Sequence, residues 1–120
     1  MPVHCVRLPI LDVDSYFANN TEEAKAWIRS MDGDDTVVDQ SQGVCATITD
    51  SKGGDHRLMA CFTGGLNCVV HESVHQAWRT IQHCSLGPVS PKNHECLSYL
   101  AAWFAEEFLR LFPIPPPAPE

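Results

Sequence analysis

Apolar residues recur with the period of an α-helix in three segments of the chain. The first segment follows Asn20 and Glu23, which have the spacing of a capping pair at a helix N-terminus. Its apolar positions are Ala24, Trp27, Ile28 and Met31. The second segment is predicted to start after a cap at Asn67 and to end near Cys84. Its predicted buried stripe consists of Val70, Val74, Ala77, Trp78 and Ile81.

The third helical segment has the most regular apolar pattern. Ser90 is its expected N-cap and Pro91 its first helical residue. Its stripe is formed by Leu97, Leu100, Ala101, Phe104, Phe108 and Leu111. The other side is largely apolar as well, through Cys96, Tyr99 and Trp103. A helix that is apolar around most of its circumference is expected to be buried, so this helix is predicted to be central.

Strand-forming residues precede the second helical segment as two runs joined by a glycine-containing turn. The runs are residues 43–49 and 56–62, and the turn is residues 51–55. A register that pairs Ile48 with Leu58 places all the apolar pairs on one face. The same register sets Cys45 opposite Cys61 on the other face, and both are expected to be free thiols.

Together these elements predict a single α+β domain over residues 1–112, because 120 residues leave little room for a second domain. A β-hairpin or small antiparallel sheet would pack on the second helix and on the central C-terminal helix. Residues 3–13, interrupted by Pro9, are predicted to be a short edge strand or an extended lead-in. Residues 113–120 are rich in proline and are predicted to form an extended tail.

Charge and composition exclude two classes of partner. The net charge is −7 and the eight Lys and Arg residues form no basic run, so nucleic-acid binding is not expected. No stretch approaches the roughly 20 apolar residues of a membrane span, so no membrane partner is expected. The N-terminus lacks the basic and apolar regions of a secretory signal, which predicts a cytoplasmic protein. Because the cytoplasm is reducing, the six cysteines of the chain are expected to be thiols, and no two of them form a C-x-x-C pair.

Candidate chemistry enters with His71, Glu72 and His75, which form the pattern H-E-x-x-H within the second predicted helix. Residues four apart lie on one side of a helix, so the two imidazoles can bind one zinc ion. Glu72 lies about 100° around the helix from His71, where it can reach a water rather than the metal. A carboxylate there is placed to act as general base in the attack of water on a carbonyl. The alternative is a chance pair of surface histidines.

A third zinc ligand is expected from the start of the next helix. A helix, a tight turn and a returning helix would carry Glu95 back over the face of His71 and His75. The resulting His₂Glu set with one open position is typical of catalytic zinc. His94 is the rival ligand, and helix phase allows only one of the two neighbours to point inward. Glu95 is favoured, and it shares its helix face with Tyr99.

Residues 70–75 and 95–103 together resemble the corresponding segments of small phage-encoded proteins that are identified as metallopeptidases. In that family H-E-x-x-H precedes a helix reading E-x-x-x-Y-L, which here begins at Glu95. The likeness covers about residues 43–108 and includes the hairpin before the metal helix. It implies a minimal zincin-like fold with gluzincin-like spacing and no defined substrate. The roles it implies are Zn²⁺ ligation by His71, His75 and Glu95 and general-base catalysis by Glu72.

Two further parts of a peptidase site have candidates. Tyr99, one turn after Glu95, is the first candidate for the donor that stabilises the oxyanion, although a core aromatic is the competing interpretation. The alternative donors are His83, His94 and His56. The strand 56–62 runs into the metal helix and is expected to be the edge to which an extended peptide adds.

The sequence therefore predicts a cytoplasmic zinc-dependent peptidase, encoded by a phage or mobile element, that acts on a protein or peptide. The main rival hypothesis keeps the zincin-like scaffold without catalysis and makes it a protein-binding accessory protein. Hydrolysis of a non-peptide amide is a third hypothesis.

Overall fold

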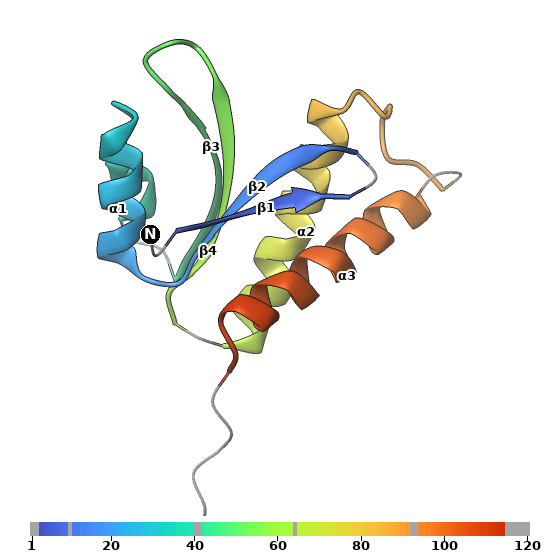
Figure 1. The fold of residues 1–120 in the computed structure, drawn as a ribbon. Helices are drawn as coiled ribbons and strands as arrows, with labels where there is room; N and C mark the ends of the chain where they lie inside the picture. The colour runs from blue at the N-terminus through green and yellow to red at the C-terminus, as the bar shows by residue number, and fades with distance from the viewer. Residues whose placement is uncertain (1–2, 10, 40–41, 64, 92–93, 115–120) are drawn as a thin grey trace, which may run out of the picture.

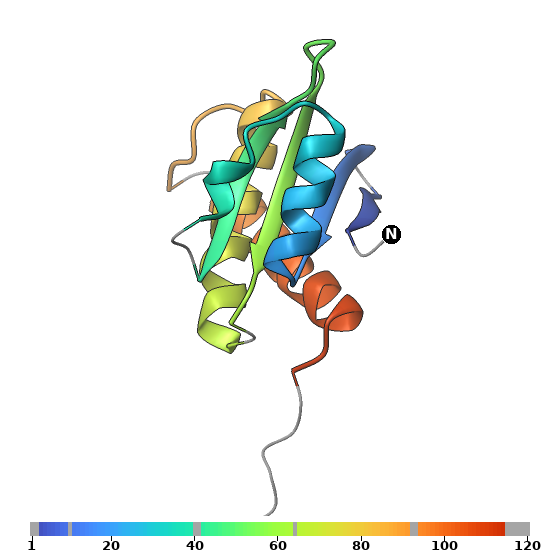
Figure 2. The same ribbon diagram turned by 90° about the vertical axis from the view of Figure 1, so that its left-hand side faces the viewer.

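A mixed four-stranded sheet lies between one helix on one face and two helices on the other (Figures 1 and 2). The computed structural model describes residues 3–9, 11–39, 42–63, 65–91 and 94–114. The strands are β1 (His4–Leu8), β2 (Val13–Ala18), β3 (Gly43–Thr49) and β4 (Asp55–Cys61), in the order β1-β2-β4-β3. The helices are α1 (Thr21–Ser30), the 3₁₀ helix η1 (Asp35–Val38), α2 (Leu66–His83) and α3 (His94–Leu111). None of the helices in the described ranges is long and apolar enough to cross a membrane.

The α+β class is confirmed, but the sheet is mixed rather than antiparallel. β2 pairs in parallel with β4, while β1–β2 and β3–β4 are antiparallel pairs. The parallel pair requires a crossover, which α1 supplies on one face of the sheet. The predicted lead-in, residues 3–13, is therefore β1 followed by a turn and the start of a second strand.

The first predicted helix is confirmed as α1, together with its cap. The side chain of Asn20 accepts a hydrogen bond from the backbone N–H of Glu23 at 3.1 Å. Ala24, Trp27 and Ile28 are buried against the sheet. This capped helix buries apolar residues on one side only, as its sequence periodicity predicts.

The predicted hairpin forms, but its register differs by two residues from the predicted one. Ile48 lies opposite His56, and Cys45 lies opposite Met59 rather than Cys61. The cause is the turn, where the Asp50 carboxylate accepts hydrogen bonds from the N–H groups of two later turn residues at 2.8 Å. The loop therefore begins at Asp50, one residue earlier than predicted, and closes onto the pair Thr49–Asp55. A shift of two residues keeps every side chain on its predicted face.

α2 buries a different arc from the predicted one. Val70, Val74 and Trp78 are exposed, and the buried positions are Val69, Glu72, Ser73, Gln76, Ala77, Thr80 and Ile81. Polar residues on this arc satisfy their own hydrogen bonds: Ser73 donates to the Val69 carbonyl at 2.6 Å and Thr80 to the Gln76 carbonyl at 2.8 Å. The free-energy cost of burying these hydroxyls is therefore small. For this reason a prediction from hydrophobicity alone assigns the wrong face of α2 to the core. The N-cap is Gly65 rather than Asn67, so α2 starts without a side-chain capping hydrogen bond.

α3 closes the core on the same side of the sheet as α2. Its predicted stripe is confirmed, since Leu100, Phe104 and Phe108 are buried and the remaining stripe residues are half-buried. The prediction of a central helix is wrong, because Cys96 and Tyr99 on its other side are exposed. The helix begins at His94, after the predicted start at Ser90 and Pro91. Residues 115–120 of the predicted tail lie outside the described residues.

Candidate metal centre

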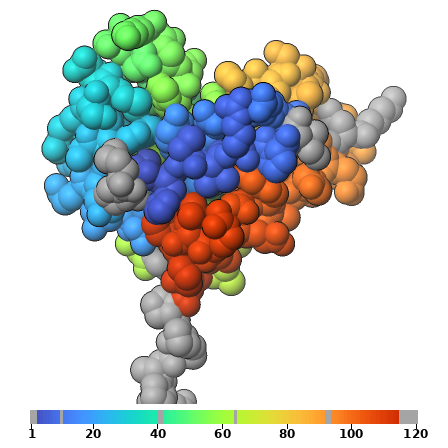
Figure 3. All heavy atoms as spheres, in the orientation of Figure 1, coloured from blue at the N-terminus to red at the C-terminus, as the bar shows by residue number. Residues whose placement is uncertain are grey.

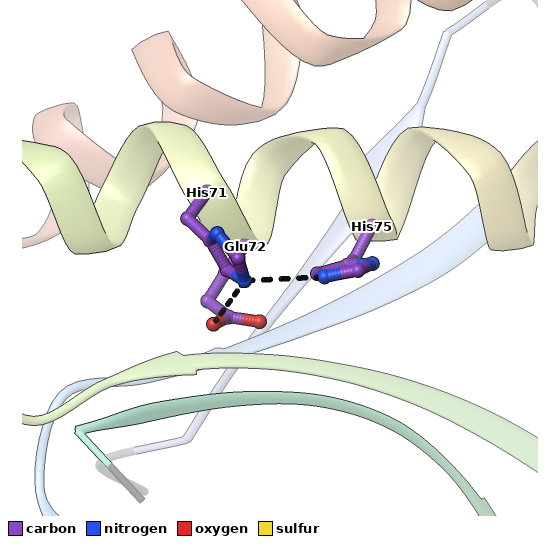
Figure 4. A group of neighbouring side chains, drawn as sticks. All are labelled: His71, Glu72 and His75. Carbon is purple, nitrogen blue, oxygen red and sulfur yellow. Dashed lines mark hydrogen bonds and ion pairs between the residues drawn. The ribbon is translucent and has the colours of Figure 1, made fainter.

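The H-E-x-x-H pattern lies on α2, and its two histidines meet as predicted. Nε2 of His71 and Nε2 of His75 are 3.2 Å apart, with ring centroids 4.8 Å apart. Both rings are exposed on the side of α2 that faces the edge of the sheet (Figure 4). The helical spacing of four residues produces this juxtaposition directly.

The spacing of the two nitrogens fits a shared zinc ion. Tetrahedral zinc with Zn–N bonds of about 2.0–2.1 Å holds its nitrogen ligands about 3.3 Å apart. The alternative for two neutral imidazoles is a hydrogen bond between the nitrogens, in which one ring donates and the other accepts. Both rings are open to an incoming ion, and neither is held by another hydrogen bond within the described part of the chain.

Glu72 lies beside the pair but faces the sheet. The residue is buried, and one carboxylate oxygen is 3.9 Å from Nε2 of His71. The candidate ligand atoms of these three residues all lie within 4.8 Å of one another. The described residues give the Glu72 carboxylate no hydrogen bond. Its oxygens are not among the enclosed polar atoms that lack a partner, so they keep contact with solvent at the neighbouring pocket, where a metal-bound water would reach them.

The wall of the site comes from the start of β3 and the first turn of α2. A pocket at this point is lined by Gln42, Gly43, Asn67, Cys68, His71 and Glu72. Gly43 makes this close approach possible, because a Cβ there would clash with the Cys68 sulfur and would lie 2.8 Å from the Ala60 carbonyl oxygen. The same Cβ would stand 3.2 Å from Cγ of Glu72. The missing side chain thus leaves room for Glu72.

Replacing this glycine should damage both packing and metal binding. We expect Gly43→Ala to lower the free energy of unfolding by roughly 1–3 kcal/mol, because the backbone carbonyl of Ala60 must move with its strand. We also expect weaker zinc binding, since Glu72 and Cys68 would be displaced. Chemical denaturation and a zinc competition titration measure the two effects. Gly65→Ala is the matched control for zinc affinity, because its Cβ would meet no atom within 4 Å.

Two thiols lie behind the site: Cys61 is buried and Cys45 is half-buried. Burial raises the pKa of Cys45 to about 12, and its sulfur lies 2.9 Å from Oε1 of Gln76. Burial is also the main reason that the pKa of Cys61 is raised. A hydrogen bond with the thiol of Cys68 is the second cause. The thiols of Cys45 and Cys61 are therefore neutral, because their surroundings penalise the thiolate.

Glu95 and Tyr99 are not brought to the histidine pair. Glu95 is exposed in the first turn of α3 and does not belong to the group formed by His71, Glu72 and His75. Figure 4 shows these three side chains projecting toward β3 and β4, with α3 on the other side of α2. Tyr99 is 61% exposed and lines a separate apolar pocket with residues of the β1–β2 connection. Figure 3 shows β1 lying against α3 on the face of the molecule that it draws.

The other candidate donors also lie elsewhere. His94 is exposed at the start of α3, and His83 is exposed at the end of α2. His56 lies on the α1 face of the sheet, where its ring contacts Tyr16 and Trp27. Its Nε2 is 2.9 Å from the carboxylate of Asp50, and this contact is the main reason that the pKa of Asp50 is lowered to about 2.

Three residues of α2 that lie near the histidines were not among the predicted site residues. Asn67 and Cys68 line the pocket, and Arg79 reaches the Thr47 hydroxyl of β3 at 3.5 Å. All three lie three or four residues from a histidine of the motif, which is the spacing of neighbours on one helix face. That spacing is the signal by which the sequence alone could have identified them.

The strand predicted to receive a peptide is internal. β4 lies between β2 and β3, so both of its edges are paired. The edge strand on the histidine side is β3, which pairs with β4 and with no other strand of the described residues.

Comparison with protein-family models, with curated proteins and with solved structures gave no match.

Proposed function

We propose that this chain is a zinc-dependent peptidase. The observation that carries the proposal is the pair of exposed imidazoles, whose Nε2 atoms are 3.2 Å apart, beside a carboxylate that borders the neighbouring pocket and accepts no hydrogen bond from the described residues. Two surface histidines without a function do not require a neighbouring carboxylate. A hydrolytic metal site requires the histidines, which bind the ion, and also a carboxylate that stays close to the ion without binding it.

His71 and His75 would hold the metal through Nε2. Zinc, when bound, polarises a carbonyl and lowers the pKa of water toward about 7. Glu72 then accepts the proton of the attacking water and passes it to the leaving amine. Its position on the sheet side of His71, 3.9 Å from Nε2, suits this role.

The substrate would bind as an extended peptide along the free edge of β3. Unpaired backbone groups on an edge strand accept an added strand, and the start of β3 lines the same pocket as His71 and Glu72. A peptide on this edge would therefore pass the proposed base. Arg79 replaces Tyr99 as the candidate oxyanion donor, since it lies one turn beyond His75 and contacts β3 at Thr47.

One feature favours the rival function of a protein-binding domain. Four exposed apolar residues follow one another at intervals of four along α2: Leu66, Val70, Val74 and Trp78. An apolar ridge of this kind on a helix surface is typical of a contact with another protein. The same ridge borders the histidine pair, so it would also suit apolar side chains of a substrate.

The test is a metal-dependent cleavage assay with the full chain. We expect about one zinc per chain, and cleavage of a mixed peptide library that is lost on chelation and restored by zinc. Mass spectrometry of the library detects new termini whatever the cleaved sequence is. Zinc binding with no cleavage of peptides or of unfolded proteins would favour the protein-binding domain, and a chain that binds no zinc would exclude the peptidase.

A further inference from the structure

The histidine pair leaves the proposed zinc site one protein ligand short. Catalytic zinc sites usually hold three protein ligands and one open position. Glu72 fills the role of base. Neither Glu95 nor Cys68 belongs to the group of His71, Glu72 and His75, so a third protein ligand has to move toward the pair when the metal binds. The third ligand must therefore come from another side chain near His71 and His75, and the lining of the pocket supplies the candidates.

Cys68 is the side chain of that lining best suited to zinc. The other non-histidine residues of the pocket offer amides, a glycine and the carboxylate of Glu72, whereas thiolate sulfur is a preferred zinc ligand. Cys68 lies three residues before His71 and so on the same side of α2. Figure 4 shows the imidazoles of His71 and His75 turned toward each other, and the turn that carries Cys68 lies on the N-terminal side of the pair.

The Cys68 sulfur is held only by weak contacts, one with the thiol of Cys61 and one with the Gln42 carbonyl. Its hydrogen bond to the Gln42 carbonyl is long, at 3.6 Å, and a thiol is a weak donor. The sulfur and Cγ of Glu72 both border the space opposite Gly43, which places the thiol beside the proposed base. Cys68 is also half-buried, in contrast to Cys61, which is 1% exposed.

We propose that Cys68 is the third protein ligand, giving a Cys-His₂ site formed by a single helix. This inference rests on the proposed zinc site and replaces Glu95 in it. On binding, the sulfur gives up its proton to solvent and exchanges its contact with Gln42 for a bond to the metal, by rotation about the Cα–Cβ bond. One position remains open for water, so the role of Glu72 is unchanged.

Cobalt(II) is the probe that tests the ligand, because a thiolate bound to cobalt gives an intense charge-transfer absorption in the near ultraviolet. We expect this band when the full chain is titrated with cobalt(II) under a phosphine reductant, which keeps all six thiols reduced. Cys68→Ser should abolish the band and weaken zinc binding by roughly tenfold or more in a chelator competition. Circular dichroism and thermal melting establish that the variant is folded.

Two cysteine controls make the result specific. Cys96→Ser changes an exposed thiol on α3 and should keep the band and the affinity. Cys61→Ala removes the thiol that contacts Cys68 and should also keep the band. Cobalt binding at the histidines without the band, or a band that survives Cys68→Ser, would overturn the inference and leave the proposed function intact. Failure of the wild type to bind either metal would reject both.

Discussion

Glu72→Gln should lower peptide hydrolysis by at least about 100-fold while zinc content and folding stay near wild type. The amide cannot accept a proton from water, whereas its size matches that of the carboxylate. Because the Glu72 carboxylate borders the pocket and accepts no hydrogen bond from the described residues, loss of its charge should not destabilise the fold. Initial cleavage rates, elemental analysis and thermal melting on one protein preparation measure the three quantities.

Glu95→Gln is the control for Glu72→Gln. Sequence spacing predicts that Glu95 binds zinc, so that its replacement would release the metal and then reduce activity. The folded chain leads to a different expectation, because Glu95 is exposed on α3 outside the histidine group. We therefore expect Glu95→Gln to retain zinc and activity. Zinc loss in Glu72→Gln would make Glu72 a ligand, and full activity in that variant would rule out its role as base.

His71→Ala and His75→Ala should each reduce zinc from about one equivalent per chain to nearly none after dialysis. Each change removes one of two imidazoles that converge at 3.2 Å, and no described histidine stands near enough to replace it. The fold should persist, because both side chains are exposed and contribute nothing to the core. Elemental analysis and circular dichroism provide the measurements.

His83→Ala is the matched control for these two variants. It changes an exposed histidine at the end of the same helix, away from the group of three. Its zinc content should equal that of the wild type. If the double variant lacking His71 and His75 kept its zinc, the metal would lie elsewhere in the chain.

The features that depend on local spacing could be predicted from the sequence. The cap at Asn20, the apolar stripe of α3 and the juxtaposition of His71 with His75 all follow from helical periodicity within a few residues. The faces of the hairpin follow in the same way, since strand alternation survives a register shift of two. These features require only that the element forms.

Which surfaces meet depends on tertiary packing, which the sequence pattern did not predict. α2 has two apolar arcs, and the arc that packs on the sheet includes Ser73 and Thr80, whose hydroxyls are satisfied within the helix. That choice turns Val74 and Trp78 outward and directs the histidines toward the edge of β3. It also puts α3 behind α2, away from the histidines. Composition cannot predict which of the two arcs packs on the sheet, because the choice depends on hydrogen bonds and packing that exist only in the folded chain.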